Sequence, residues 1–212
     1  MNDKVVILGT AHRLREPGKC SPDKRLREAV WSREIIDELN VKLQDYGIMT
    51  FVDFWPYDLE KSMQTPSVGL ERQRELALRV NTVNQICDRY GKNNCCYVSI
   101  HVNASGSDGK WHDASGWQVC VAPNSSKKSR LLAECLAEEA YDKCLRVREP
   151  QPGQKYWQQS LYVLNRTKCP AVLTENLFMD NEKEADFLLS ELGRHTIERL
   201  HLEGIMRYLD KI

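Results

Sequence analysis

Three polar residues stand where short apolar runs of the chain come to an end. His12 follows the run at residues 5–9, His101 ends the run at 95–100, and Glu175 ends the run at 171–174. In open α/β sheets, ligands gather beyond the carboxyl ends of the parallel strands. If these runs are neighbouring strands, the two imidazoles and the carboxylate meet at one edge of the sheet.

Glu28 is the fourth residue with a chemical interpretation. On a predicted helix it continues a stripe formed by Ser32, Ile35 and Leu39, so a carboxylate extends an apolar face. A buried carboxylate is costly unless it pairs with a cation or a metal. The pattern therefore indicates a carboxylate that needs a positive partner.

Two histidines and one glutamate form a recognised set of zinc ligands that leaves the fourth position for water. They also favour zinc over other divalent ions. His12, Glu28 and His101 are thus candidate ligands for one zinc ion. Bound water then has a pKa of about 7. Glu175, which is not a ligand in this scheme, accepts the proton of that water and later passes one to the leaving group.

Each of these residues also fits an ordinary structural role. A histidine at a strand end is commonly a hydrogen-bonded loop residue, and a glutamate early in a helix is commonly solvated or ion-paired. No local ligand signature joins His12, Glu28 and His101, because they are far apart in the chain. Cys20 is a rival ligand close to His12, since thiolate also suits zinc. Spacing alone leaves these alternatives open.

The elements that position these residues follow from the hydrophobic pattern. Short apolar runs alternate with longer periodic segments, which is typical of an α/β domain with a mostly parallel sheet. We expect strands at 5–9, 48–54, 95–101, 116–122, 160–164 and 171–174. We expect helices from Ser21-Pro22 to just before Gly47, over 70–90, over 126–145, and from Asn181 onward with a break near Gly193. The longest loops are predicted at 13–19, 55–68, 104–115 and 148–159.

Composition excludes several classes of protein. The 212 residues are 42% hydrophobic and 28% charged, and 30 Lys plus Arg balance 30 Asp plus Glu. A zero formal charge argues against a nucleic-acid partner. No apolar run approaches the length of a membrane helix or a signal sequence, so we expect a chain made in the cytoplasm without membrane insertion. Eight cysteines without a Cys-x-x-Cys pair predict reduced, structural thiols.

Several segments, in order, resemble one known family. The segment 5–12 is similar to the family's opening strand that ends in a zinc histidine, and Glu28 precedes a hydrophobic helix as the family's glutamate ligand does. The stretch Ser-Ile-His-Val-Asn-Ala at 99–104 is close to the motif Ser-Ile-His-x-Asn-Ala, and 170–175 resembles the segment that carries the catalytic glutamate. The chain therefore resembles the zinc-dependent N-acetylmuramoyl-L-alanine amidases of the amidase-3 type, which include cell-wall amidases and phage endolysins.

This resemblance implies a single α/β domain over residues 1–212, with a twisted, mostly parallel six-stranded sheet flanked by helices and no separate cell-wall-binding domain. It implies one Zn²⁺ on His12, Glu28 and His101, with Glu175 as the catalytic residue. It also implies hydrolysis of the amide between N-acetylmuramic acid and L-alanine, with peptidoglycan as partner. We expect a monomer that acts on the cell wall after export or phage-assisted release.

The sequence departs from the family pattern around His12, and we expect this difference to affect how the substrate binds. Residues 9–13, Gly-Thr-Ala-His-Arg, lack the proline and the second glycine of Asp-Pro-Gly-His-Gly. We expect Arg13 to lie beside the metal, reshape the entrance and contact substrate. Asn103 is a second candidate substrate contact, because residues at strand ends often bind ligands. The match leaves no room for an additional blocking helix, so we expect an open groove.

Two other functions remain possible from the sequence. One is an inactive zinc-containing peptidoglycan-binding module, against which the presence of Glu175 argues. The other is a zinc peptidase that cuts within the stem peptide, which shares the metal chemistry but not the family resemblance.

Overall fold

The computed structural model describes residues 4–54 and 58–212. Its centre is a six-stranded sheet in the order β2-β1-β3-β6-β4-β5. The strands are β1 (Val5–Thr10), β2 (Met49–Val52), β3 (Cys95–Asn103), β4 (Gln118–Val121), β5 (Trp157–Gln158) and β6 (Ala171–Phe178). Strands β2, β1, β3 and β6 are parallel, whereas β4 runs antiparallel to β6. The predicted fold class is confirmed.

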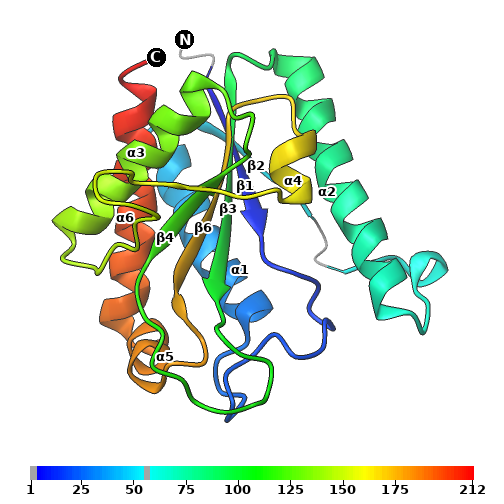
Figure 1. Cartoon of the computed structure of the whole chain (residues 1–212). Helices are drawn as coiled ribbons and strands as arrows, with labels where there is room; N and C mark the ends of the chain where they lie inside the picture. The colour runs from blue at the N-terminus through cyan, green and yellow to red at the C-terminus, as the bar shows by residue number, and fades with distance from the viewer. Residues whose placement is uncertain (1–3, 55–57) are drawn as a thin grey trace.

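Helices cover both faces of the sheet (Figure 1). They are α1 (Glu28–Asp45), α2 (Val68–Tyr90), α3 (Lys127–Asp142), α4 (Tyr162–Arg166), α5 (Glu182–Leu189) and α6 (Glu191–Leu209), with a short 3₁₀ helix at Lys61–Met63. Alternate residues of β1 enter opposite cores, as the pleat of a strand requires. Val6 and Leu8 pack in the core with α1, α3 and α6, and Val5 and Ile7 pack in the core with α2 and α4.

The first helix begins later than predicted. Ser21 does not cap it; its hydroxyl accepts a hydrogen bond from the Leu26 amide at 3.0 Å and donates one to Asp23 at 2.6 Å. The Ser21 amide also donates to the Leu26 carbonyl at 2.8 Å, which closes a turn that includes Lys24 at φ 65°. Because the capping residue is used in this turn, α1 begins at Glu28.

The predicted strand at 160–164 is wrong. The chain forms the two-residue strand β5 and then the helix α4, in which the amides of Leu164 and Asn165 donate to the Leu161 carbonyl at 3.1 and 2.9 Å. A short apolar run does not distinguish a strand from a helical turn by its period. The break in the C-terminal helix is confirmed, but it lies at Ser190, whose hydroxyl caps α6 by accepting from the Gly193 amide.

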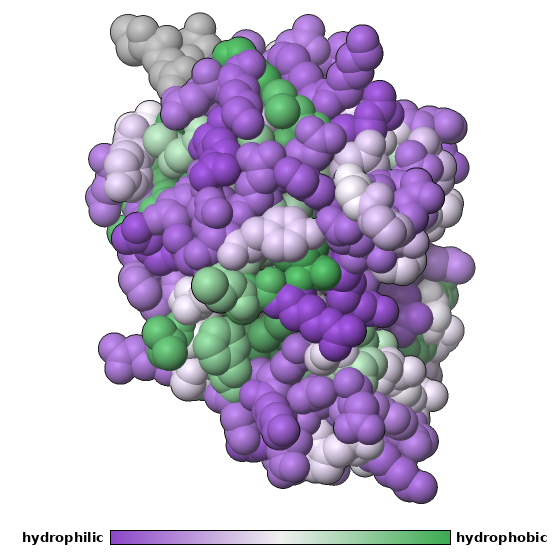
Figure 2. All heavy atoms as spheres, turned by 60° about the vertical axis from the view of Figure 1, so that its left-hand side comes forward, coloured by the Kyte–Doolittle hydropathy of each residue, from purple (hydrophilic) through white to green (hydrophobic). Residues whose placement is uncertain are grey.

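Hydrophilic residues cover most of the face seen in Figure 2, with apolar residues gathered in a smaller central region. In the ranges that the structure describes, no helix combines the length and apolarity needed to cross a membrane.

Most of the cysteines are buried, at positions 87, 95, 96, 120, 135 and 169, whereas Cys144 is exposed and Cys20 is half-buried. The predicted loop at 55–68 contains the 3₁₀ helix, and residues 55–57 lie outside the described ranges.

Candidate metal centre

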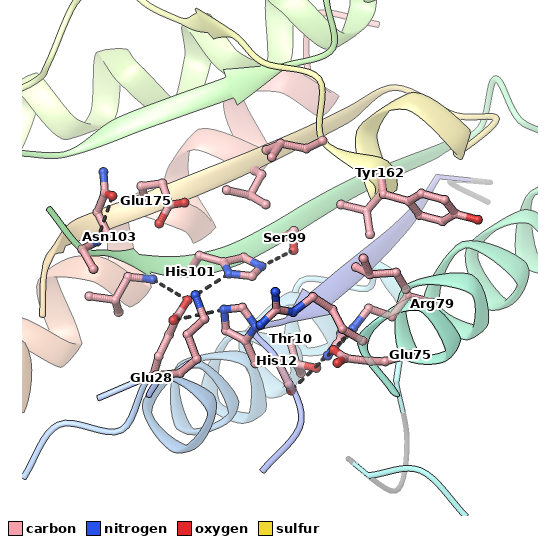
Figure 3. Close-up of a pocket in the computed structure, with 18 of the residues that line it drawn as sticks. Thr10, His12, Glu28, Glu75, Arg79, Ser99, His101, Asn103, Tyr162 and Glu175 are labelled. Carbon is pink, nitrogen blue, oxygen red and sulfur yellow. Dashed lines mark hydrogen bonds and ion pairs between the residues drawn. The ribbon is translucent and has the colours of Figure 1, made fainter. Parts of the chain in front are cut away.

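The carboxyl ends of three parallel strands bring the candidate residues together. His12 lies two residues beyond β1, His101 lies in β3 and Glu175 lies in β6, directly opposite His101 in the strand register. Glu28 enters from the first position of α1 (Figure 3). The sheet edge expected from the sequence is therefore the place where these four side chains meet.

Three of them form a compact group. His12 Nε2 lies 3.2 Å from one carboxylate oxygen of Glu28, and His101 Nδ1 lies 2.9 Å from the other. The two rings are edge to face, with centroids 5.2 Å apart. One ligand atom from each residue lies within 4.8 Å of the others, and the described part of the chain holds no other group of three potential ligands this close. The arrangement has the residue types and spacing of a site for a single metal ion.

Burial and charge set the protonation of this group. Burial by itself would raise the pKa of Glu28, but the positive charges and hydrogen bonds of His12 and His101 outweigh it and hold that pKa below its usual range. Burial lowers the pKa of His101, against the opposing effect of Glu28. An ionised carboxylate and a neutral imidazole are the forms that bind a metal.

Glu175 differs from Glu28 although both line the same pocket. Burial, followed by the negative charge of Glu28, raises the pKa of Glu175 to about 8. Its Oε2 atom is buried and has no hydrogen-bond partner among the described residues. A buried acceptor without a partner is costly, so this oxygen is ready to bind a proton donor that enters the pocket. The residues present therefore fit a cation on the three ligands with a free carboxyl group beside it.

The backbone at His12 is held by two arginines that sequence reasoning missed. His12 has φ 45°, in the left-handed region that is uncommon for residues other than glycine. Its carbonyl accepts hydrogen bonds from Arg33 at 2.7 Å and from Arg79 at 3.1 Å. Arg79 also pairs with Asp53 and Glu75. The sequence could have indicated them, because Arg33 and Arg79 lie within otherwise apolar stripes of α1 and α2.

Arg13 does not lie where the sequence analysis placed it. Its side chain is only 1% exposed and forms ion pairs with Glu16, Glu71 and Glu75. A guanidinium with this many carboxylate partners stays with them rather than in the pocket. The expected contact of Arg13 with substrate is therefore corrected: the residue ties the loop after β1 to α2.

Of the two remaining candidates, Asn103 lines the pocket and Cys20 lies outside the group of metal ligands. Asn103 lines the pocket at the end of β3, after a register shift between His101 and Asn103. Its side-chain oxygen accepts from the Ala104 amide at 2.9 Å, which leaves its amide group available. Cys20, the rival ligand, is outside the three-residue group and forms a backbone bridge with Arg27.

The pocket around the group has a volume of about 360 Å³. Its apolar lining comes from α2, from the N-cap and first turn of α4 and from β6: Leu76, Leu161, Val163 and Leu173. Tyr162, which is 45% exposed, also lines the pocket. Because polar and charged residues line the rest of the pocket, it can orient a ligand by both kinds of contact.

Comparison with known proteins gives the context of this site. The family described as N-acetylmuramoyl-L-alanine amidase matches residues 6–207. The chain is 31% identical over 130 residues to an endolysin of Bacillus phage SPP1, covering 59% of this chain and 46% of the endolysin. It is 26% identical over 212 residues to a probable cell wall amidase, LytH, of Staphylococcus saprophyticus, covering 100% of this chain and 60% of LytH. The chain thus spans about half the length of the curated relatives it matches.

Solved structures share the fold. The CwlD amidase of Clostridioides difficile, solved in complex with the GerS lipoprotein, superposes with a TM-score of 0.77 at 23% identity, and the match covers 99% of this chain and 100% of CwlD. An N-acetylmuramoyl-L-alanine amidase from Clostridium difficile 630 gives a TM-score of 0.78 at 20% identity, with 99% and 98% of the two chains covered. At these identities the likeness concerns the fold.

Proposed function

Because this chain belongs to the N-acetylmuramoyl-L-alanine amidase family, we propose that it hydrolyses the amide between the lactyl group of N-acetylmuramic acid and L-alanine in peptidoglycan. The observation that carries this proposal is the meeting of His12, Glu28 and His101 beside the partnerless carboxyl oxygen of Glu175. We further propose that residues 1–212 act as one catalytic domain at the cell wall.

Zinc is the proposed metal, because two imidazoles and one carboxylate favour it. His12, Glu28 and His101 would hold it, with one ion per chain. When bound, the ion supplies a Lewis acid that polarises the scissile carbonyl and makes hydroxide available near neutral pH. The main-chain N–H of Val102 donates to Glu28 at 3.2 Å and helps to keep this carboxylate in place.

Glu175 is proposed as the group that moves the proton. Its partnerless Oε2 atom accepts a proton from the attacking water and then delivers it to the nitrogen of L-alanine as the amide bond breaks. A pKa raised by burial suits both directions of transfer, since an efficient acid–base catalyst has a pKa near the working pH. Asn103 is proposed to contact the substrate from the end of β3.

The test is mass spectrometry of purified peptidoglycan after incubation with the zinc-loaded protein. Free stem peptides that begin with a new L-alanine amino group, together with glycan that lacks peptide, would support the amidase. Shortened stems still attached to muramic acid would instead indicate a zinc peptidase. Unchanged peptidoglycan of several chemotypes would indicate a binding module without activity.

Two variants separate the proposed roles. Glu175→Gln should retain zinc, measured by metal analysis, and lose about 10²–10⁴-fold in turnover, the usual contribution of a general acid–base group. His12→Ala should lose both zinc and activity, because it removes a ligand. Loss of zinc from the Glu175 variant would contradict the separate role given to this residue.

A further inference from the structure

Lys19 occupies an unusual position among the cations of the pocket. Three Lys or Arg side chains line it in the described structure, and two of them are paired with carboxylates: Arg72 with Glu16, and Arg79 with Asp53. The side chain of Lys19 has no ion pair or hydrogen bond with any described residue. An unpaired ammonium group in a pocket is available to an anionic group of a ligand.

The backbone keeps Lys19 close to the candidate metal centre. The Lys19 carbonyl accepts a hydrogen bond from the Glu28 amide at 3.0 Å, which ties it to the first residue of α1. Its charge is also felt by Glu175, whose raised pKa it partly lowers. Lys19 therefore lies in the preceding loop, beside the first residue of α1 and within electrostatic reach of the proposed acid–base residue.

The pocket has two different sides. In Figure 3, Glu175 and Tyr162 lie on opposite sides of the His12–His101 pair. The side of Tyr162 also carries Arg79 and Glu75, whose charges are paired with each other, whereas the side of Glu175 carries Asn103. A substrate that crosses the centre consequently meets Glu175 and Asn103 on one side, and the Tyr162 ring with an internally paired charge cluster on the other.

The proposed reaction determines which part of the substrate lies on which side. Glu175 must face the L-alanine nitrogen to protonate it, so the stem peptide extends on its side and the sugar lies toward Tyr162. The second stem residue is a glutamate linked through its γ-carboxyl group. Its α-carboxyl group is therefore the first carboxylate after the scissile bond, at a distance of about 7 Å in an extended stem.

We propose that Lys19 binds the α-carboxylate of the second stem residue and thereby makes the site prefer stems in which this group is free over stems in which it is amidated. This inference rests on the proposed amidase function. An ammonium–carboxylate contact in a partly buried pocket is stronger than a neutral one, and loss of the substrate's charge leaves the ammonium without its partner.

The test compares two soluble substrates that differ in one group: N-acetylmuramoyl tripeptides with either D-glutamate or D-isoglutamine at the second position. The zinc-loaded wild type should show a kcat/KM at least about tenfold higher for the free carboxylate, mainly through KM. In Lys19→Met this ratio should approach one, whereas Lys19→Arg, which retains the charge, should preserve it. Lys92→Met, which changes an exposed lysine before β3, is the matched control and should behave as wild type.

The other possible results of this comparison would contradict either the role of Lys19 or the amidase function. Lack of preference in the wild type, or an unchanged ratio in Lys19→Met, would overturn the proposal. A Lys19→Met variant with reduced kcat on both substrates, an altered pH profile and an unchanged ratio would show that Lys19 acts on Glu175 instead of on the stem. Hydrolysis of neither substrate by the wild type would contradict the amidase function itself. Metal analysis of each variant shows that the ratio is compared at equal zinc content.

Discussion

Replacing Glu175 by glutamine is expected to stabilise the metal-free protein at alkaline pH. The Glu175 carboxyl group is buried beside Glu28, which raises its pKa from 4.5 to about 8. Below pH 4.5 the group is protonated in both the folded and the unfolded chain. Between pH 4.5 and about 8 the unfolded chain loses this proton first, so the group lowers the free energy of unfolding as pH rises. Above pH 8 the loss is complete and stays constant.

The magnitude follows from the size of this pKa change. One pKa unit corresponds to about 1.4 kcal/mol, so the full loss is on the order of 5 kcal/mol. Glutamine has nearly the same shape and no charge, and therefore avoids this cost. The gap in unfolding free energy between Glu175→Gln and wild type should widen from pH 5 to pH 8 and then level off.

Urea denaturation of the chelator-treated proteins at pH 5, 6.5, 8 and 9 measures this gap. Glu60→Gln, which removes an exposed carboxylate, is the control for the loss of one charge and should show a much smaller dependence on pH. The reasoning is refuted if the Glu175→Gln gap stays constant over this range, or if this variant is the less stable protein at pH 9.

Three further predictions concern the frame around the site and its metal. Arg79→Met should lower the free energy of unfolding by about 3–5 kcal/mol in urea denaturation, since it leaves the buried carboxylate of Asp53 without its ion pair; a loss below 1 kcal/mol would contradict this. Gly9→Ala should cost about 1–3 kcal/mol, because the new Cβ would lie 2.3 Å from the Tyr97 hydroxyl oxygen. Its control, Gly69→Ala in α2, meets open space and should be neutral or stabilising by thermal denaturation. Chelation should abolish peptidoglycan hydrolysis and zinc should restore it; activity that persists after complete metal removal would exclude the proposed mechanism.

The sequence indicated the four residues that meet at the candidate metal centre, although it missed the supporting Arg33 and Arg79 and misplaced Arg13. His12, His101 and Glu175 end apolar runs, and the carboxyl ends of parallel strands must share one edge, so their meeting followed from the pattern. Glu28 was recognisable because it continued an apolar stripe on α1. The α/β class followed from the same alternation of short and long apolar segments.

Local pattern was insufficient where a segment was short. Residues 160–164 form an apolar run that is too short for its period to separate a strand from one helical turn. Ser21 and the proline after it carry a helix-start signal, yet the hydroxyl is used in the turn before Glu28. In both cases the decision depends on contacts with the rest of the chain.

The charged network behind the site was decided only by tertiary structure. Arg79 and Glu75 lie one turn apart in α2 and Arg79 pairs with Asp53 after β2. Arg13 turns toward this network although it follows a candidate ligand directly. A charged side chain has many possible partners in a sequence that holds 30 residues of each sign. An unpaired charge costs far more free energy when it is buried than when it is exposed to water. The pairs that form are therefore those between charges that folding buries together.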